Sequence, residues 1–259
     1  MAAISETAGG GLKVERSHRD QDININLLPF ISFSYGRKDH TMSIQPRPAY
    51  ILENSKSADR SNEGSLKIQR MMASTIQAMA SLLEKRDTYT SCHQIRVAKL
   101  ASAIAAEMDF SGDQIRGLNL ASSIHDVGKI AIPLQILTKP GKLNDLEFNM
   151  VKEHPKVAHD VLMNMEFYWP VSQMVYQHHE RLDGSGYPQG LIGQAILPEA
   201  RVLAVADVVE AMSFERPYRP ALGIATALEE ITTGRGLLYN ADAVDACLRL
   251  FSEKGFILG

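Results

Sequence analysis

Residues 111 to 129, SGDQIRGLNLASSIHDVGK, contain the pattern that decides the fold. Ser111 is followed three residues later by Gln114, which is the spacing of a capping box at the start of a helix. The segment ends close to the adjacent pair His125 and Asp126. This pattern predicts a core helix that is followed by an imidazole and a carboxylate on one turn.

Helical periodicity continues on both sides of this segment. Upstream, apolar residues recur at steps of three and four, as a buried helical stripe requires, at Ile68, Met72, Ile76, Met79 and Leu83. Further helices are predicted around 97–104, from a capping box at Asn144 and Glu147, after His154, from Pro170, and over 199–212, about 221–232 and 241–253. Because no segment alternates polar and apolar residues over six or more positions, the sequence predicts an all-α helical bundle.

The first 64 residues have a different character. They are polar and are interrupted by glycine and proline, with one apolar patch at 27–33. This composition predicts a mostly irregular N-terminal extension over 1–64, in which the patch could add a strand. The helical domain is predicted over 65–259.

Composition limits the classes of function. The 27 lysines and arginines are balanced by 30 aspartates and glutamates, so we expect no long nucleic acid or anionic lipid surface as a partner. Cys92 and Cys247 lie far apart in a chain with no signal-peptide pattern. No apolar run approaches the roughly 20 residues of a membrane span. These features predict free thiols and a cytoplasmic protein without a membrane anchor.

Five histidines and two aspartates form the candidate site: His93, His125, Asp126, His154, His178, His179 and Asp207. Imidazoles gathered inside a protein without a metal would lack partners for both ring nitrogens. A divalent ion removes this difficulty, and imidazole nitrogen with carboxylate oxygen suits iron, manganese, zinc or nickel. A single histidine such as His93 is more often structural, and it is the full set that indicates a metal centre.

Seven candidate ligands are too many for one ion, and they predict two ions that share Asp126. With two ions roughly 3.5 to 4 Å apart, a bridging water becomes hydroxide near neutral pH and can attack phosphorus in line with a leaving oxygen. The candidate site therefore predicts a hydrolase of phosphate esters, with Asp126 at its catalytic centre.

Several motifs, in this order and spacing, resemble the HD-GYP family, the cyclic di-GMP phosphodiesterase branch of the HD superfamily. The resemblance runs from about Lys85 to Phe251. It is carried by 86–98 (RDTYTSCHQIRVA), 125–130 (HDVGKI), 154–155 (HP), 178–188 (HHERLDGSGYP), 206–212 (ADVVEAM) and 216–219 (RPYR). It implies a bacterial, HD-type helical bundle that hydrolyses cyclic di-GMP to linear pGpG, to GMP or to both.

The resemblance also implies a role for each candidate ligand. The first ion would be held by His93, His125, Asp126 and Asp207. The second would be held by His154, His178 and His179, with Asp126 bridging. Iron and manganese are expected ahead of zinc and nickel.

Two positions depart from the family pattern. Some family members bind a third ion through a glutamate four residues before the first histidine, but Tyr89 occupies that position here, so we expect two ions. The family often has Phe-Asp-Pro before its last helix, where this chain has Tyr239, Asn240 and Ala241. Asn240 can still serve as the N-cap of that helix.

Substrate contacts are implied in the same way. Lys129 matches a lysine that reaches the scissile phosphate, where its ammonium could stabilise charge on the phosphoryl oxygens; alternatively it is a solvated lysine at a helix end. Arg216 and Arg219 match residues that clamp the phosphates and base of the dinucleotide, unless they are simply surface arginines. The Gly-Tyr-Pro loop, which contains Gly184 to Pro188, is expected to shape the opening through which substrate enters or to dock a diguanylate cyclase. Its candidate contacts are Asp183, Gly184 and Tyr187.

Two rival functions stay open from the sequence. The domain could be an inactive module that binds cyclic di-GMP or docks a diguanylate cyclase, although docking alone does not require five histidines and two aspartates at these spacings. The same metal centre could instead cut another cyclic dinucleotide, because the sequence does not determine which base is recognised. A homodimer is also left open.

Overall fold

The computed structural model describes the strands within residues 3–46, Thr75 and Ala78, and the segments 92–215 and 220–258. The chain divides into two compact units, Met1–Gln69 and Arg70–Gly259. The domain boundary that we place between residues 64 and 65 stays a prediction. Among the helices of these described segments, none is both long and apolar enough to cross a lipid bilayer.

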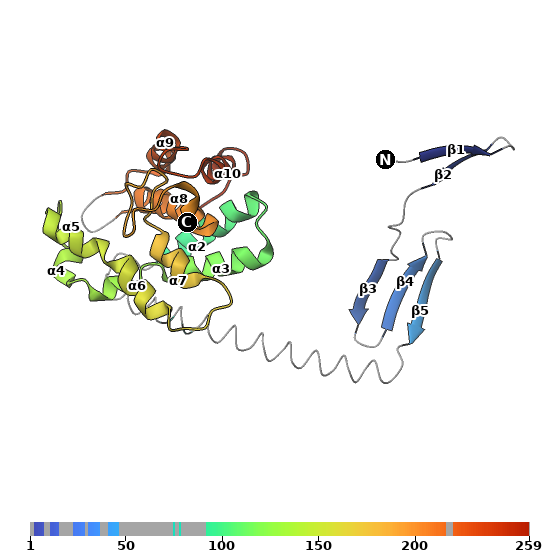
Figure 1. Ribbon diagram of the computed structural model, residues 1–259, viewed down its shortest axis with the longest axis horizontal. Coiled ribbons are helices and arrows are strands. Elements are labelled where there is room, and N and C mark those ends of the chain that lie inside the picture. The colour runs from blue at the N-terminus through green and yellow to red at the C-terminus, as the bar shows by residue number, and fades with distance from the viewer. Residues whose placement is uncertain are drawn as a thin grey trace. The chain divides into compact units, whose positions relative to one another are not determined.

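The described part of the first unit consists of short antiparallel strands. β1 (Ala3–Thr7) pairs with β2 (Gly11–Glu15), and β3 (Ile23–Leu28), β4 (Ile31–Gly36) and β5 (Thr41–Pro46) form a second sheet in that order (Figure 1). The sequence does not predict these strands as a set, although it allows for one at the apolar patch 27–33, which β3 and β4 overlap. Their polar and apolar residues alternate over too few positions, as in 23–27, to meet the six-residue pattern that we required of a strand.

The second unit confirms the predicted helical bundle in the residues described. Its larger core lies between α2 (His93–Glu107), α3 (Gly112–Ile124), α8 (Pro198–Ser213), α9 (Ile224–Thr233) and α10 (Ala241–Ser252) (Figure 1). α8 is apolar on nearly every side, which is why it is buried in the centre of the bundle.

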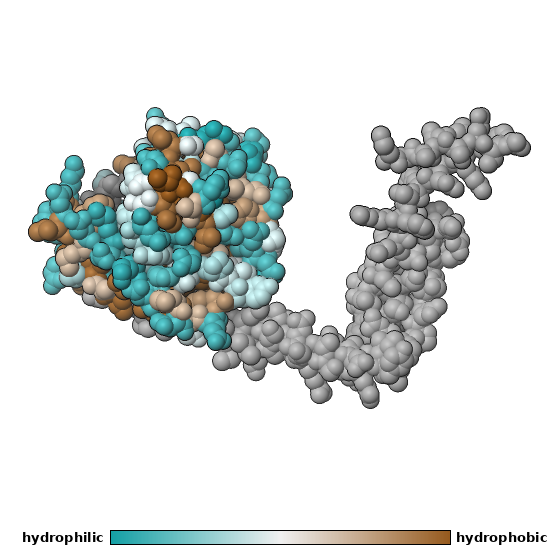
Figure 2. Space-filling view, in the orientation of Figure 1, coloured by the Kyte–Doolittle hydropathy of each residue, from teal (hydrophilic) through white to brown (hydrophobic). Residues whose placement is uncertain are grey.

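Hydrophilic residues dominate the visible face of the unit, with hydrophobic residues in smaller patches (Figure 2).

A smaller core supports the other side of the bundle. It joins the end of α3 to α6 (His154–Leu162) and α7 (Val171–Gln177), through buried side chains that include Ile124, Leu162 and Met174. The 3-10 helix η1 (Val127–Ala131), α4 (Leu134–Leu137) and α5 (Asp145–Lys152) connect α3 to α6, and the 3-10 helix η2 (Gly193–Ala195) precedes α8. The two cores meet along α3, which therefore fixes the position of the residues that follow it.

The predicted helix starts are confirmed where the structure describes them. Both capping boxes form, since the Gln114 amide donates to Ser111 Oγ at 3.3 Å and the Glu147 amide donates to Asn144 Oδ1 at 2.9 Å. Asn240 caps α10 by accepting from the Ala243 amide at 2.9 Å. The helix predicted over 68–83 lies outside the described residues except at Thr75 and Ala78, both of which are helical.

Gly128 lets η1 approach α6 closely. A Cβ atom at this position would lie 1.9 Å from the carbonyl oxygen of His154 and 2.8 Å from the amide nitrogen of Ala158. Both atoms belong to the backbone, so they cannot move aside as a flexible side chain would. We expect Gly128→Ala to lower the free energy of unfolding by about 3 kcal/mol or more, measured by urea denaturation.

Gly112→Ala is the matched control for this substitution. Gly112 is the first residue of α3, and a Cβ there would meet only Arg116 Nη1 within 4 Å, at an ordinary contact distance of 3.6 Å. This variant should change the free energy of unfolding by less than about 1 kcal/mol. Equal losses in the two variants would show that the approach of η1 to α6 is not the cause.

Candidate metal centre

The helical unit brings the seven predicted ligands together. Their ligand atoms form three groups, and within each group all the atoms lie within 4.8 Å of one another. The groups are His154, His178 and His179; His93, His125 and Asp207; and His125, Asp126 and His178. Because His125 and His178 each belong to two groups, the seven side chains form one continuous cluster. The fold thus joins residues that span more than half of the helical unit's sequence.

Helix ends supply most of the cluster. Six of the residues lie where a helix begins or has just ended: His93 at the start of α2, His125 and Asp126 between α3 and η1, His154 at the start of α6, and His178 and His179 after α7. Asp207 instead lies within α8. The cluster is therefore built where several helices converge on the middle of α8.

Backbone hydrogen bonds orient three of the imidazole rings. In each, Nδ1–H donates to the carbonyl oxygen three residues earlier: His125 to Ser122 at 2.8 Å, His154 to Val151 at 2.7 Å, and His178 to Val175 at 2.6 Å. These carbonyls belong to the last turns of α3, α5 and α7, where the helix itself leaves acceptors unused. A carbonyl can only accept, so Nδ1 carries the proton and the Nε2 of the neutral ring presents a lone pair.

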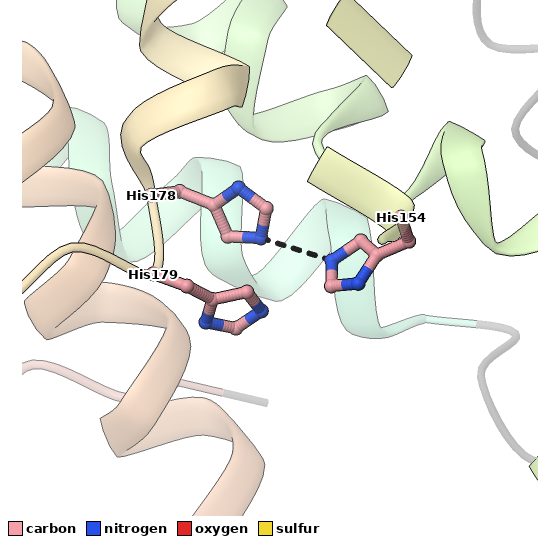
Figure 3. Close-up of side chains that lie close together, drawn as sticks. All are labelled: His154, His178 and His179. Carbon is pink, nitrogen blue, oxygen red and sulfur yellow. Dashed lines mark hydrogen bonds between the residues drawn. The ribbon is translucent and has the colours of Figure 1, made fainter. Parts of the chain in front are cut away.

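The Nε2 atoms face partners that only a cation would satisfy. His154 Nε2 and His178 Nε2 point toward one another at 3.3 Å (Figure 3). With Nδ1 protonated in both neutral rings, neither Nε2 has a proton to donate to the other. His125 Nε2 is buried without a hydrogen-bond partner in the described part of the chain, 3.5 Å from Asp126 Oδ2 and 3.7 Å from Asp207 Oδ1. This set of donor atoms fits a divalent metal, which accepts several lone pairs at once.

Asp126 presents one carboxylate oxygen to each part of the cluster. Its Oδ1 lies 3.4 Å from His154 Nε2, whereas its Oδ2 lies 3.5 Å from the Nε2 atoms of both His93 and His125. Asp207 approaches one part, with Oδ1 3.3 Å from His93 Nε2. The arrangement of Asp126 is the one that a carboxylate bridging two ions requires.

Burial and nearby charges shift the pKa values of three histidines and two aspartates in the cluster. Burial lowers the pKa of His154 to about 4 and that of His178 to about 3, and it holds the pKa of His179 well below its usual value. Burial alone would raise the pKa values of Asp126 and Asp207, but the Lys129 ammonium near Asp126 and the imidazoles around both residues outweigh it, so both values lie well below normal. At neutral pH these three imidazoles are therefore neutral, and both carboxylates are ionised.

A comparison with known families agrees with this geometry. A family model described as an HD domain matches residues 67–242. The chain belongs to the HD domain family. The predicted membership of the HD-GYP branch is confirmed as well, because the relatives that match this chain include proteins named as cyclic di-GMP phosphodiesterases.

Individual relatives of this HD-GYP chain are phosphodiesterases by name. It is 41% identical over 177 residues to the cyclic di-GMP phosphodiesterase response regulator RpfG of Xanthomonas campestris, covering 68% of this chain and 47% of that protein. It is 34% identical over 177 residues to the 3'3'-cGAMP-specific phosphodiesterase 1 of Vibrio cholerae, covering 67% and 41%. The chain spans about half the length of the curated relatives it matches.

A solved structure supports the fold. The HD-GYP chain is similar to Bd1817, an HDG"Y"P protein from Bdellovibrio bacteriovorus, with a TM-score of 0.53 and 19% sequence identity. The similarity covers 61% of this chain and 51% of the other. At this identity the comparison bears on the helical architecture alone.

The predicted substrate residues of the HD-GYP chain differ in how they meet the cluster. Lys129 Nζ lies 2.7 Å from Asp126 Oδ2, and the Tyr187 ring lies against His179 with centroids 4.7 Å apart. Asp183 and Gly184 lie in the loop that follows α7, where Asp183 Oδ1 accepts from the Ser185 amide and hydroxyl. Arg216 and Arg219 lie outside the described residues, so their roles stay predictions.

Two buried glutamates of the HD-GYP chain were not predicted as parts of the site. Glu180 accepts from the amides of Gln189 and Leu191, at 2.7 and 2.9 Å, and thereby ties the Gly-Tyr-Pro loop to the residues after α7. Glu210 makes a close contact with His93 Nδ1. A signal for Glu210 is present in the sequence, because a carboxylate three residues after Asp207 shares its helix face.

The metal-free HD-GYP domain should lose stability as the pH falls from about 6.5 to about 4. In the unfolded chain His154 and His178 take up protons near pH 6.5, but in the folded protein they stay neutral down to a pKa of about 4 and about 3. The unfolded state therefore binds more protons in this window, and each such histidine lowers the free energy of unfolding by up to about 1.4 kcal/mol per pH unit.

Urea denaturation in the presence of a chelator, repeated across this pH window, measures the effect. The slope should be shallower in a His154→Gln variant, which has one fewer buried imidazole to protonate on unfolding. A wild-type stability that stayed constant through the window would contradict the assignment of neutral, buried histidines.

Proposed function

We propose that this HD-GYP domain is a metal-dependent phosphodiesterase that hydrolyses cyclic di-GMP to linear pGpG, to GMP or to both. The observation that carries the proposal is the convergence of five imidazoles and two carboxylates, with the two oxygens of Asp126 directed to different parts of the cluster. The 41% identity to a protein named as a cyclic di-GMP phosphodiesterase supports the choice of substrate.

Two divalent ions would be held by the cluster, with iron or manganese as the expected metals. One would bind His93, His125, Asp126 and Asp207, and the other would bind His154, His178, His179 and Asp126. When bound, such ions supply Lewis acidity toward water and toward the phosphoryl oxygens.

Lys129 would stabilise the charge that develops on the phosphoryl group. Asp126 Oδ2 holds its ammonium at 2.7 Å, and the Lys129 side chain remains 27% exposed, so a ligand arriving from solvent can reach it. An ammonium fixed in this way donates hydrogen bonds to a phosphoryl oxygen without first having to be oriented. The Tyr187 ring, packed against His179, would shield one side of the centre from water.

A second candidate substrate is a mixed guanine-adenine cyclic dinucleotide. The 34% identity to a protein named as 3'3'-cGAMP-specific favours keeping it, because the described residues do not show how a base is recognised. Both substrates share the phosphodiester chemistry that the metal centre would perform. An inactive module that binds cyclic di-GMP is the remaining alternative, and it differs from the enzyme in releasing no product.

Metal analysis combined with product identification tests the proposal. The chain is purified under reducing conditions, its metal content is determined, and it is incubated separately with cyclic di-GMP and with 3'3'-cGAMP. We expect two metal ions per chain and release of pGpG or GMP from cyclic di-GMP, with slower release from cGAMP. Faster cleavage of cGAMP would favour the second candidate, and a metal-loaded protein that binds dinucleotide but releases no product would favour the binding module.

A further inference from the structure

His93 is oriented by a different kind of partner from the three histidines described above. It is the first residue of α2, so this helix provides no carbonyl oxygen one turn before it. Its Nδ1 instead makes a close contact with Oε2 of Glu210, which lies on α8. The side chain of Glu210 therefore helps to orient this ring.

Glu210 is itself held in place by Arg96, which packs against the Phe214 ring. Its side chain is fully buried, and Oε1 accepts from Arg96 Nε at 2.7 Å and lies 2.6 Å from Arg96 Nη2. The guanidinium carbon of Arg96 lies 3.8 Å from the centroid of the Phe214 ring. The guanidinium compensates the negative charge of the buried carboxylate.

The two pairs lie one helical turn apart on the same two helices. His93 Nε2 and Asp207 Oδ1 approach to 3.3 Å between α2 and α8, and Arg96 and Glu210 follow three residues later on each helix. Residues three positions apart share a helix face. Where α2 packs against α8, one helical turn therefore carries the proposed ligands His93 and Asp207. The next turn carries Arg96 and Glu210, of which Glu210 contacts His93.

We propose that Glu210, held by Arg96, is a positioning residue that fixes His93 as the Nδ1–H tautomer and thereby strengthens binding of the ion held by His93, His125 and Asp207. The Nδ1–H group donates to the carboxylate, which would leave the Nε2 lone pair available to that ion and make it a stronger donor. This inference rests on the proposed metal centre. It assigns a role to two residues outside the seven proposed ligands.

The Glu210→Gln variant tests the role of the carboxylate. The amide of glutamine can donate to Nδ1 as well as accept from it, so it no longer enforces one tautomer. In metal-free protein, at a pH at which the His93 ring is neutral, ¹⁵N NMR of labelled histidines should show Nδ1–H for His93 in the wild type and a mixture in the variant. Metal titration should show one ion bound about 10- to 100-fold more weakly, with the other unchanged.

Two further variants separate positioning from structure. Glu199→Gln removes another buried carboxylate from α8, one that accepts from Gln114 Nε2 at 3.1 Å, and it should leave the affinities of both ions unchanged. Arg96→Gln leaves Glu210 in place without its guanidinium, and it should weaken the same ion as Glu210→Gln does. Because Arg96 is partly exposed, this variant also provides the test if Glu210→Gln does not fold.

The possible results have distinct meanings. Unchanged ion affinity in both Glu210→Gln and Arg96→Gln would overturn the inference, and so would an Nε2–H tautomer of His93 in the wild type. Equal weakening of both ions, or the same loss in Glu199→Gln, would show a structural role instead and would also overturn it. A wild-type chain that bound no metal would contradict the proposed function, whereas the NMR result would still report separately whether Glu210 sets the tautomer.

Discussion

In an Asp126→Ala variant, both metal ions and all phosphodiesterase turnover are expected to be lost. The two carboxylate oxygens of Asp126 face different parts of the cluster, 3.4 Å from His154 Nε2 and 3.5 Å from His93 Nε2. Removing them takes one negatively charged ligand from each proposed ion at once, while the remaining imidazoles are neutral. Elemental analysis of the purified variant and a cyclic di-GMP turnover assay measure the two losses.

Asp160→Ala provides the control for this variant. Asp160 is an exposed aspartate whose Oδ2 lies 2.7 Å from Lys156 Nζ. It therefore pairs with a lysine at the same distance as Asp126 does, but it is not one of the proposed metal ligands. We expect it to retain both ions and full turnover. Full activity in Asp126→Ala would show that the two-metal centre is wrong.

For Lys129→Ala we expect about a 10²-fold fall in kcat with both metal ions still bound. The ammonium interacts with Asp126 from outside the imidazole cluster, so its loss removes a donor to the phosphoryl group but none of the metal ligands. Metal content by elemental analysis, with kcat and KM for cyclic di-GMP, separates these effects.

Lys156→Ala serves as the control here, because it removes a lysine that also pairs with an aspartate but is 52% exposed on α6. It should change neither metal content nor kcat. A normal kcat in Lys129→Ala would exclude Lys129 from the chemistry, and loss of metal would show that its main effect is to stabilise the ionised Asp126.

Sequence patterns were sufficient to predict the longer helices among the described residues and the membership of the cluster. Ser111 with Gln114 and Asn144 with Glu147 are local signals, since each cap is complete within one helical turn. The cluster could be predicted because imidazoles and carboxylates need one another or a metal when buried, wherever the chain brings them from. The short strands of residues 3–46 carry too little alternation to be predicted in this way.

Other features depend on long-range contacts that residue spacing does not reveal. The contact of Glu210 with His93 joins positions 117 residues apart, and the hydrogen bonds on Nδ1 depend on where each helix ends. Docking of a diguanylate cyclase through the Gly-Tyr-Pro loop, formation of a homodimer, and the clamp by Arg216 and Arg219 all stay predictions.

The backbone acceptors of His125, His154 and His178 affect how this centre tolerates mutation. Every amino acid carries a main-chain carbonyl, so substitutions at Ser122 or Val175 can alter packing without deleting the atom that sets the ring direction. The orientation of these three rings is therefore set by the course of the backbone rather than by the identity of those side chains. The contact from Glu210 depends on a side chain instead. A single substitution at Glu210 can therefore change the orientation of the His93 ring even though all seven proposed ligands are still present.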